Sequence, residues 1–167
     1  FDTRPCFKAW KVTVQIVKGT NLPAADTISM KGLGKGLYEA SDPMVLMEVE
    51  GCVGRTSVID QTLNPQWEDE PFVYYLLLLQ GSTIEFKVYD WDRDGGHDFL
   101  GDCSLSLSDL SLGVQSEHTM DLGDGEDKTQ DRGQLTFRVK LEPTFSFGHK
   151  TGKLYIINQI RNKMNGD

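Results

Sequence analysis

Short segments in which apolar and polar residues alternate run through the sequence, and this period of two constrains the fold more than any other feature. Residues 10–17 (WKVTVQIV), 83–89 (TIEFKVY) and 134–141 (QLTFRVKL) show it most clearly. Successive side chains of a strand point to opposite faces, so the alternation predicts strands with one buried and one solvated face. The intervening segments are rich in Gly, Asn, Asp and Pro, which favour turns. The pattern therefore predicts an antiparallel β-sandwich.

About eight strands follow from this pattern. Beyond the three clearest segments, we expect strands within residues 44–49, 55–59, 67–79, 99–107 and 118–122. The side chains expected to face the core, at least in part, are Trp10, Val12, Val14, Ile16, Ile84, Phe86, Val88, Phe137 and Val139. The glycine-rich stretch from Asp26 to Ser41 is expected to be a long loop. A chain of 167 residues can bury such a core without disulfides or metal ions to hold it together.

The charge balance narrows the range of partners. The chain has 25 acidic and 17 basic residues and a formal net charge of −8. Nucleic-acid binding is not expected, because contact with phosphates needs a basic face. Adhesion to an anionic membrane by net charge alone is disfavoured as well. Cys6, Cys52 and Cys103 are odd in number and widely spaced, which favours reduced thiols and a cytoplasmic location. The first residue is Phe1 in place of Met, which indicates a piece of a larger protein.

The segment from Asp90 to Asp98 concentrates carboxylates at the end of a predicted strand. Asp92 and Asp94 lie between these two, and a pair of glycines lets the chain turn back toward the strand end. Two carboxylates about 4 Å apart repel each other by about 4 kcal/mol at an effective dielectric near 20. A calcium ion, which takes about six to eight oxygen ligands, relieves this repulsion. The alternative is an ordinary acidic surface loop. An EF-hand is excluded, because strands and not helices flank the segment.

Three motifs together resemble the C2 domain, the membrane module of protein kinase C, synaptotagmins and phospholipases. In chain order they are residues 22–43, with Leu22, Asp26 and the sequence SDP at 41–43; residues 62–67 (TLNPQW); and residues 90–101, with the spacing Asp-x-Asp-x5-Asp-Phe-x-Gly. They resemble the family's first calcium loop, its Thr-Leu-Asn-Pro-x-Trp turn and its third calcium loop. The region of resemblance runs from about Trp10 to Leu141, which is most of the chain.

The resemblance implies an all-β fold, an eight-stranded antiparallel C2 β-sandwich. Its calcium loops would lie near residues 26–42, 60–66 and 90–98, at one end of the sandwich. A full strand at 134–141 follows the short one near Leu122, and this order resembles the phospholipase-like (type II) permutation of the family's strands. We place the C2 domain at residues 1–142 and a C-terminal extension at residues 143–167.

The extension is predicted to be helical near residues 153–164, because Ile156, Ile157, Ile160 and Met164 lie at helical spacing. Three interpretations of it stay open. It is a helix packed on the sandwich or on a neighbouring domain, an amphipathic helix that faces a membrane, or an added strand.

The resemblance also implies a set of calcium ligands. They are the side chains of Asp26, Asp42, Asp90, Asp92 and Asp98 and the backbone oxygen of Trp91. Asp94 lies in the same loop and either ligates a further ion or is solvated. The first loop is longer than is usual for the family, which makes Glu39 an alternative to Asp26. Asn64 and Trp67 are assigned to the turn and the core, not to the ligand set.

Membrane contact is predicted at the tip of the third loop and in the long first loop. The residues concerned are Met30, Lys31, Leu33, Lys35 and His97. Apolar side chains and lysines in one loop suit an interface with anionic headgroups. The alternative is a first loop that folds down onto the sandwich or is disordered. Phosphoinositide binding by residues 47–55 is not supported, because Arg55 is the one cation there.

The predicted function is a calcium-dependent module that docks a larger protein to anionic phospholipid membranes, in signalling or membrane trafficking. Such a protein would be cytoplasmic and would become peripheral to the membrane when calcium binds. The alternative is a C2 scaffold that binds a protein partner, with calcium structural or absent. Catalysis is not expected, because the sequence lacks a Gly-x-Ser-x-Gly elbow, a phosphate-binding Gly-Lys-Ser/Thr and a Cys/His pair in context.

Overall fold

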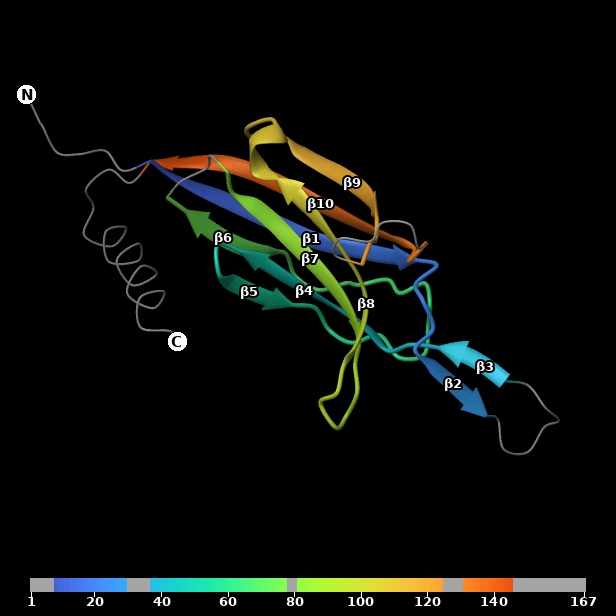
Figure 1. The fold of residues 1–167 in the computed structure, drawn as a ribbon. Helices are drawn as coiled ribbons and strands as arrows, with labels where there is room; N and C mark the ends of the chain where they lie inside the picture. The colour runs from blue at the N-terminus through green and yellow to red at the C-terminus, as the bar shows by residue number, and fades with distance from the viewer. Residues whose placement is uncertain (1–7, 30–36, 78–80, 125–130, 146–167) are drawn as a thin grey trace, which may run out of the picture.

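Two four-stranded antiparallel sheets pack face to face in the computed structural model (Figure 1), which describes residues 8–29, 37–77, 81–124 and 131–145. From edge to edge, the first sheet consists of β6 (Phe72–Leu76), β1 (Lys8–Thr20), β10 (Gln134–Phe145) and β9 (Gln115–Asp121). The second sheet consists of β5 (Cys52–Arg55), β4 (Pro43–Val49), β7 (Thr83–Asp90) and β8 (Asp98–Ser106). A 3-10 turn, η1 (Leu107–Asp109), follows β8. The predicted β-sandwich is thereby confirmed.

The apolar face of each alternating strand lies against the other sheet. Val12, Val14 and Ile16 of β1 are at most 2% exposed, and the inward residues of β7 and β10 are buried to the same degree. The rings of Phe86 and Phe137 stack across the interface with their centroids 4.2 Å apart. Trp10 is partly buried and packs against this core. The predicted core residues are therefore confirmed, and their burial is the main source of stability, at about 1.5–3 kcal/mol for each large side chain.

One predicted strand was wrong in its position. We expected a strand at residues 55–59, but the strand beside β4 is Cys52–Arg55 and ends where the prediction began. Glu50 and Gly51 form the two-residue connection between β4 and β5, and both have positive φ angles, 49° and 77°. Such a tight turn starts the pairing at once, with Val49 opposite Cys52. A glutamate at a positive φ is uncommon, so the sequence carried a weak signal for this turn.

The prediction of a long loop from Asp26 to Ser41 was also wrong in part. It contains a two-stranded hairpin, in which β2 (Asp26–Ser29) pairs with β3 (Leu37–Ala40). The hairpin forms a separate sheet and projects from one end of the sandwich (Figure 1). Each strand has four residues, too few for a pattern of alternation to identify.

The first and last strands lie side by side in the middle of their sheet, with Val14 opposite Val139. Because the first and last described strands are neighbours, the order of the strands can be circularly permuted without a change of the sandwich. The assignment to type II stays a prediction.

β10 runs to Phe145, beyond the expected domain end at residue 142. The division into residues 1–142 and 143–167 also stays a prediction, and the helix expected near 153–164 lies outside the described residues. In the described part of the chain, no helix has the length and apolar character needed to cross a membrane.

Replacing Val14 by Asp should unfold the domain, because Val14 is 0% exposed and an unpaired carboxylate would enter the core. The expected loss is at least about 4 kcal/mol, close to the whole stability of many domains. Thermal unfolding followed by circular dichroism measures it. Gln15→Asp is the matched control, because Gln15 is only half-buried, faces away from the core and lies opposite Arg138. Cooperative unfolding of Val14→Asp near the wild-type temperature would contradict the assignment of the buried face.

Candidate calcium site at one end of the sandwich

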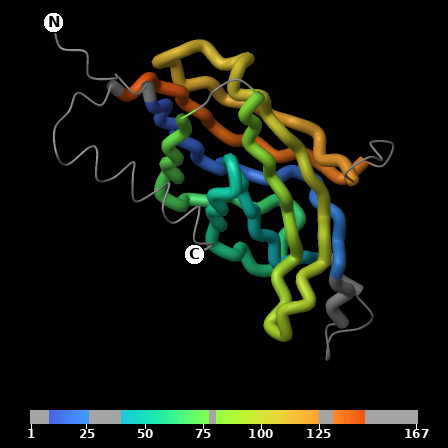
Figure 2. Tube along the Cα trace, turned by 60° about the vertical axis from the view of Figure 1, so that its left-hand side comes forward, coloured from blue at the N-terminus to red at the C-terminus, as the bar shows by residue number. Residues whose placement is uncertain are grey.

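The register of three neighbouring strands brings the predicted acidic ligands to the same end. Pro43 at the start of β4 lies opposite Asp90 at the end of β7. Asp90 in turn lies opposite Asp98, where β8 begins. The β7–β8 loop and the β2–β3 hairpin both project from this end (Figure 1). A second view shows the connection between β8 and β9 at the opposite end of the sandwich (Figure 2).

Asp90 and Asp42 link the first and third loops. The Asp90 side chain is 1% exposed, and its Oδ1 accepts a hydrogen bond from the Asp42 N–H at 2.5 Å. The Trp91 N–H donates to the backbone oxygen of Asp42 at 2.9 Å. The Oδ1 of Asp42 accepts a hydrogen bond from the N–H of Gln61, in the second loop, at 2.7 Å. All three loops are therefore connected through carboxylates that backbone amides orient.

The third loop folds back on itself over residues 91–97. The Gly95 N–H donates to the backbone oxygen of Asp92 at 3.1 Å, and Gly95 has a φ of 88°, which favours glycine. The Nδ1 of His97 accepts a hydrogen bond from the Asp92 N–H at 2.9 Å. The His97 ring also stacks on Trp91, with ring centroids 6.3 Å apart. The predicted membrane contact of His97 stays a prediction, while its Nδ1 already serves to close the loop.

The remaining carboxylates of this loop are exposed to different degrees. Asp94 Oδ1 accepts a hydrogen bond from the Gly96 N–H at 3.2 Å, so this side chain caps a local turn. Asp94 and Asp98 are exposed and Asp92 is half-buried. The structure therefore offers a graded set of carboxylates, from the buried Asp90 to the solvated Asp94.

The second loop fixes the path of the chain into the core, as expected for the TLNPQW sequence. Asn64 Oδ1 accepts a hydrogen bond from the Asn21 N–H at 2.9 Å. Trp67 is buried, and its Nε1–H donates to the backbone oxygen of Ser57 at 3.0 Å. The assignments of Asn64 to a turn and of Trp67 to the core are confirmed.

The structure describes residues 26–29 and 37–41 of the first loop. Ser41 Oγ donates to the backbone oxygen of Pro23 and accepts from the Ala25 N–H, both at 3.0 Å, which places the start of β2 beside Asp42. Asp26 lies opposite Ala40 in the hairpin. The side chains of Asp26 and Glu39 and the predicted membrane contacts Met30, Lys31, Leu33 and Lys35 lie outside what the structure describes.

The chemistry of the donors fits calcium, although the side chains that the structure describes do not converge on one point. Among the described side chains, no group of three or more His, Cys, Asp or Glu is placed to hold a metal ion. The amides of Asp42 and Gln61 hold the Asp90 and Asp42 carboxylates. The donor set consists of carboxylate and main-chain oxygens, which suits a hard divalent cation. Sequence reasoning missed the contributions of Gln61 and Ser41, because a backbone N–H and a serine hydroxyl carry no pattern of their own.

Known proteins share this architecture. The family model of the C2 domain matches residues 10–122. Synaptotagmin-3 of Arabidopsis thaliana is 31% identical over 113 residues, which cover 66% of this chain and 21% of the relative. This chain thus spans about a fifth of the length of that relative.

Solved structures agree on the fold. A C2 domain of plant Extended Synaptotagmin 1 superposes with a TM-score of 0.66 at 24% identity and covers 84% of this chain and 98% of that one. A structure of two C2 domains of Extended-Synaptotagmin 2, calcium bound, superposes with a TM-score of 0.62 at 24% identity over 78% of this chain and 45% of that one. At these identities the likeness shows the fold alone.

Removing the His97 ring should loosen the third loop, because the Asp92 N–H loses its acceptor. His97→Ala should speed hydrogen exchange at the Asp92 amide by roughly fivefold, which corresponds to about 1 kcal/mol for a lost hydrogen bond. NMR hydrogen exchange without calcium measures it. In His97→Asn, the Asn Oδ1 offers an acceptor near the position of Nδ1 and should restore the protection. Equal exchange in all three proteins would show that this hydrogen bond does not hold the loop.

Proposed function

Because the chain belongs to the C2 domain family, we propose that it is a calcium-dependent module that docks a larger protein to anionic phospholipid membranes. The observation that carries the proposal is the gathering of Asp42, Asp90 and Asp98 at one end of three neighbouring strands. Chain segments far apart in sequence meet there and bring oxygen ligands with them. Carboxylates at one end of the sandwich repel one another, and a cation bound there would reduce this repulsion.

The residues that would hold calcium are the oxygen donors of the first and third loops. They are Asp26, Asp42, Asp90, Asp92 and Asp98, the backbone oxygen of Trp91, and Asp94 for a further ion. Each bound calcium adds two positive charges to a chain of net charge −8, and it offers coordination positions to lipid phosphate. The chain's own part is to present these oxygens on a rigid sandwich end, and Asp90 is already oriented by the Asp42 amide.

A second candidate is a C2 scaffold that binds protein, with calcium structural or absent. One observation favours it: the described carboxylates do not converge on a common point. Sedimentation with phosphatidylserine vesicles separates the two functions. Binding to vesicles only when calcium is present supports the membrane module, whereas equal sedimentation with calcium and with EGTA supports the scaffold.

Calcium should raise the melting temperature, because only the folded chain gathers these carboxylates. At about a hundredfold excess over Kd, the gain is about 2.7 kcal/mol, or roughly 5–10 °C for a domain of this size. Differential scanning calorimetry measures it, and magnesium should do much less because it sheds its water reluctantly.

The double variant Asp90→Asn with Asp92→Asn should lose the calcium response while keeping the fold, since an amide oxygen can still accept the Asp42 N–H. Asp109→Asn, beyond the far end of β8, is the control and should keep the response. A melting curve of the wild type that millimolar calcium leaves unchanged would reject calcium binding.

The first loop should contribute to membrane affinity. Replacing Met30 and Leu33 by Ser should weaken calcium-dependent vesicle binding by roughly tenfold, since about 1.5 kcal/mol of apolar transfer is lost. The calcium titration in solution should not change. Leu112→Ser with Val114→Ser removes two side chains that are 52% and 56% exposed at the opposite end, and is the matched control. Undiminished vesicle binding of the Met30 and Leu33 variant would assign the hairpin another role.

A further inference from the structure

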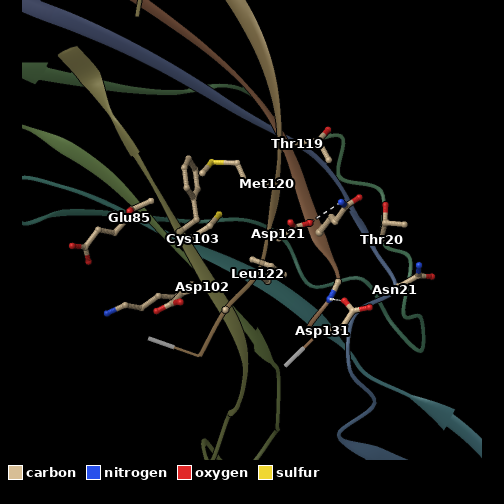
Figure 3. Close-up of a pocket in the computed structure, with 16 residues that line it drawn as sticks. Thr20, Asn21, Glu85, Asp102, Cys103, Thr119, Met120, Asp121, Leu122 and Asp131 are labelled. Atoms are coloured by element: carbon tan, nitrogen blue, oxygen red, sulfur yellow. Dashed lines mark hydrogen bonds between the residues drawn. The ribbon is translucent and has the colours of Figure 1, made fainter. Parts of the chain in front are cut away.

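A groove opens between the two sheets along the edge formed by β8 and β9 (Figure 3). Its cavity volume is about 1090 Å³. Residues of β7, β8 and β9 line it, together with the end of β1 and the start of β10. None of the predicted calcium ligands belongs to its lining, so it is a separate feature of the domain.

The floor of the groove is apolar. Phe86 and Leu122 are buried, and Cys103 and Met120 are half-buried against the core. These two remain partly open because β8 and β9 are edge strands, and in the described part of the chain no further strand lies beside them. Burial, with the nearby Asp102 carboxylate as a smaller cause, raises the pKa of Cys103 to about 12. The thiol is therefore neutral at physiological pH and behaves as an apolar group.

The shape of the groove is fixed by backbone contacts at one end. The Asp102 N–H donates to Gly123 O at 2.9 Å, and the Gly123 N–H donates to Asp102 O at 2.8 Å. At Gly101 a Cβ atom would lie 2.9 Å from the Leu122 Cβ, which is closer than real Cβ atoms come. Glycine therefore allows β8 to approach this segment, and the groove exists before any ligand arrives.

The rim of the groove is acidic. The residues that line it include four acidic ones, Glu85, Asp102, Asp121 and Asp131, and one lysine, Lys87. Asp121 Oδ1 accepts a hydrogen bond from Gln134 Nε2 at 2.8 Å, and Asp131 Oδ1 accepts from the Gly133 N–H at 3.0 Å (Figure 3). An ionised carboxylate can accept about four hydrogen bonds, so Asp121 and Asp131 retain capacity for a cationic partner. Both side chains are exposed.

The strand beside the groove is open to pairing. In the described part of the chain, β9 pairs only with β10. Its exposure alternates, and Ser116, His118 and Met120 face the half-buried side. An extended peptide can add to such an edge and place every second side chain into a groove.

We propose that the groove between β8 and β9 binds an extended basic segment of a protein partner. An apolar side chain of this segment enters over Cys103 and Met120, and flanking Lys or Arg residues meet Asp121 and Asp131. The acidic rim favours a basic segment over an anionic lipid and over a second copy of this chain. An anionic lipid headgroup would meet a rim of like charge, and a second copy of this chain would bring its own net charge of −8.

The test is fluorescence anisotropy on the full chain in EGTA, without lipid, so that its outcome does not depend on the calcium or membrane function. The probe is a fluorescein-labelled ten-residue peptide in which Lys and Leu alternate. Asp121→Asn with Asp131→Asn should weaken binding at least tenfold and reduce its dependence on salt. At both positions the Asn Oδ1 can still accept the hydrogen bond that the Asp Oδ1 accepts in the structure.

Two controls separate the groove from general attraction between a basic peptide and an acidic chain. Glu68→Gln with Glu70→Gln changes the net charge by the same amount on exposed residues just before β6, at the opposite edge of the sheet, and should bind like the wild type. A peptide with Ser in place of Leu should bind at least tenfold more weakly. Met120→Gln tests the floor by itself and should also weaken binding at least tenfold.

Equal binding by the Asp121 and Asp131 variant and by the Glu68 and Glu70 variant would overturn the proposal, as would equal binding of the two peptides. Two further results would show that the groove has another occupant, and either would overturn the proposal of a partner segment. One is dimerisation in sedimentation velocity that the Asp121 and Asp131 variant abolishes. The other is at least tenfold tighter peptide binding when Lys153, Arg161 and Lys163 of the chain itself are replaced by Gln.

Discussion

Every other feature of this domain depends on the apolar contact between its two sheets. The stacked rings of Phe86 and Phe137 lie within it, and the inward residues of β1, β4, β7 and β10 surround them. Because side chains alternate along a strand, a shift of one residue in register would turn the apolar set of a strand to solvent. The core therefore fixes the register of the strands, and the register fixes which loop residues meet at each end.

The acidic end of the sandwich shows what this register achieves. β4 and β7 run antiparallel, so the start of one lies against the end of the other and Asp42 meets Asp90. A buried carboxylate is costly unless hydrogen bonds compensate it, and the Asp42 amide provides one. The sandwich thereby holds a charged group in place beside the more exposed third loop. That combination of a rigid carboxylate with more exposed ones, Asp94 and Asp98, suits a site that changes its charge when a cation binds.

The edge formed by β8 and β9 is closed in one part and open in another. In the middle of β8, paired hydrogen bonds between Asp102 and Gly123 join this strand to the segment that follows β9. Further along the same edge the sheets separate, and Cys103 and Met120 stay half-buried between them. Closure at one end and opening along the rest produce a preformed groove, with aspartates on its rim that the calcium loops do not use. The domain thus has two acidic regions of different kinds, one made of loop ends and the other of strand edges.

Sequence alone determined the core, the family and most of the strands, because these depend on local patterns. Alternation identified Val12, Val14, Ile84 and Phe137 as buried, and three short motifs identified the C2 domain. The tight turn at Glu50 and Gly51 escaped, because a glutamate seldom adopts a positive φ. Contacts between residues far apart in the sequence were not predicted either. The Asp42 and Asp90 hydrogen bond joins residues 48 positions apart, and the groove joins strands from both sheets. The pairing of β4 with β7 decides the first contact and the packing of one sheet on the other decides the groove, since sequence patterns specify which face of a strand is buried but not what lies beside or across from it.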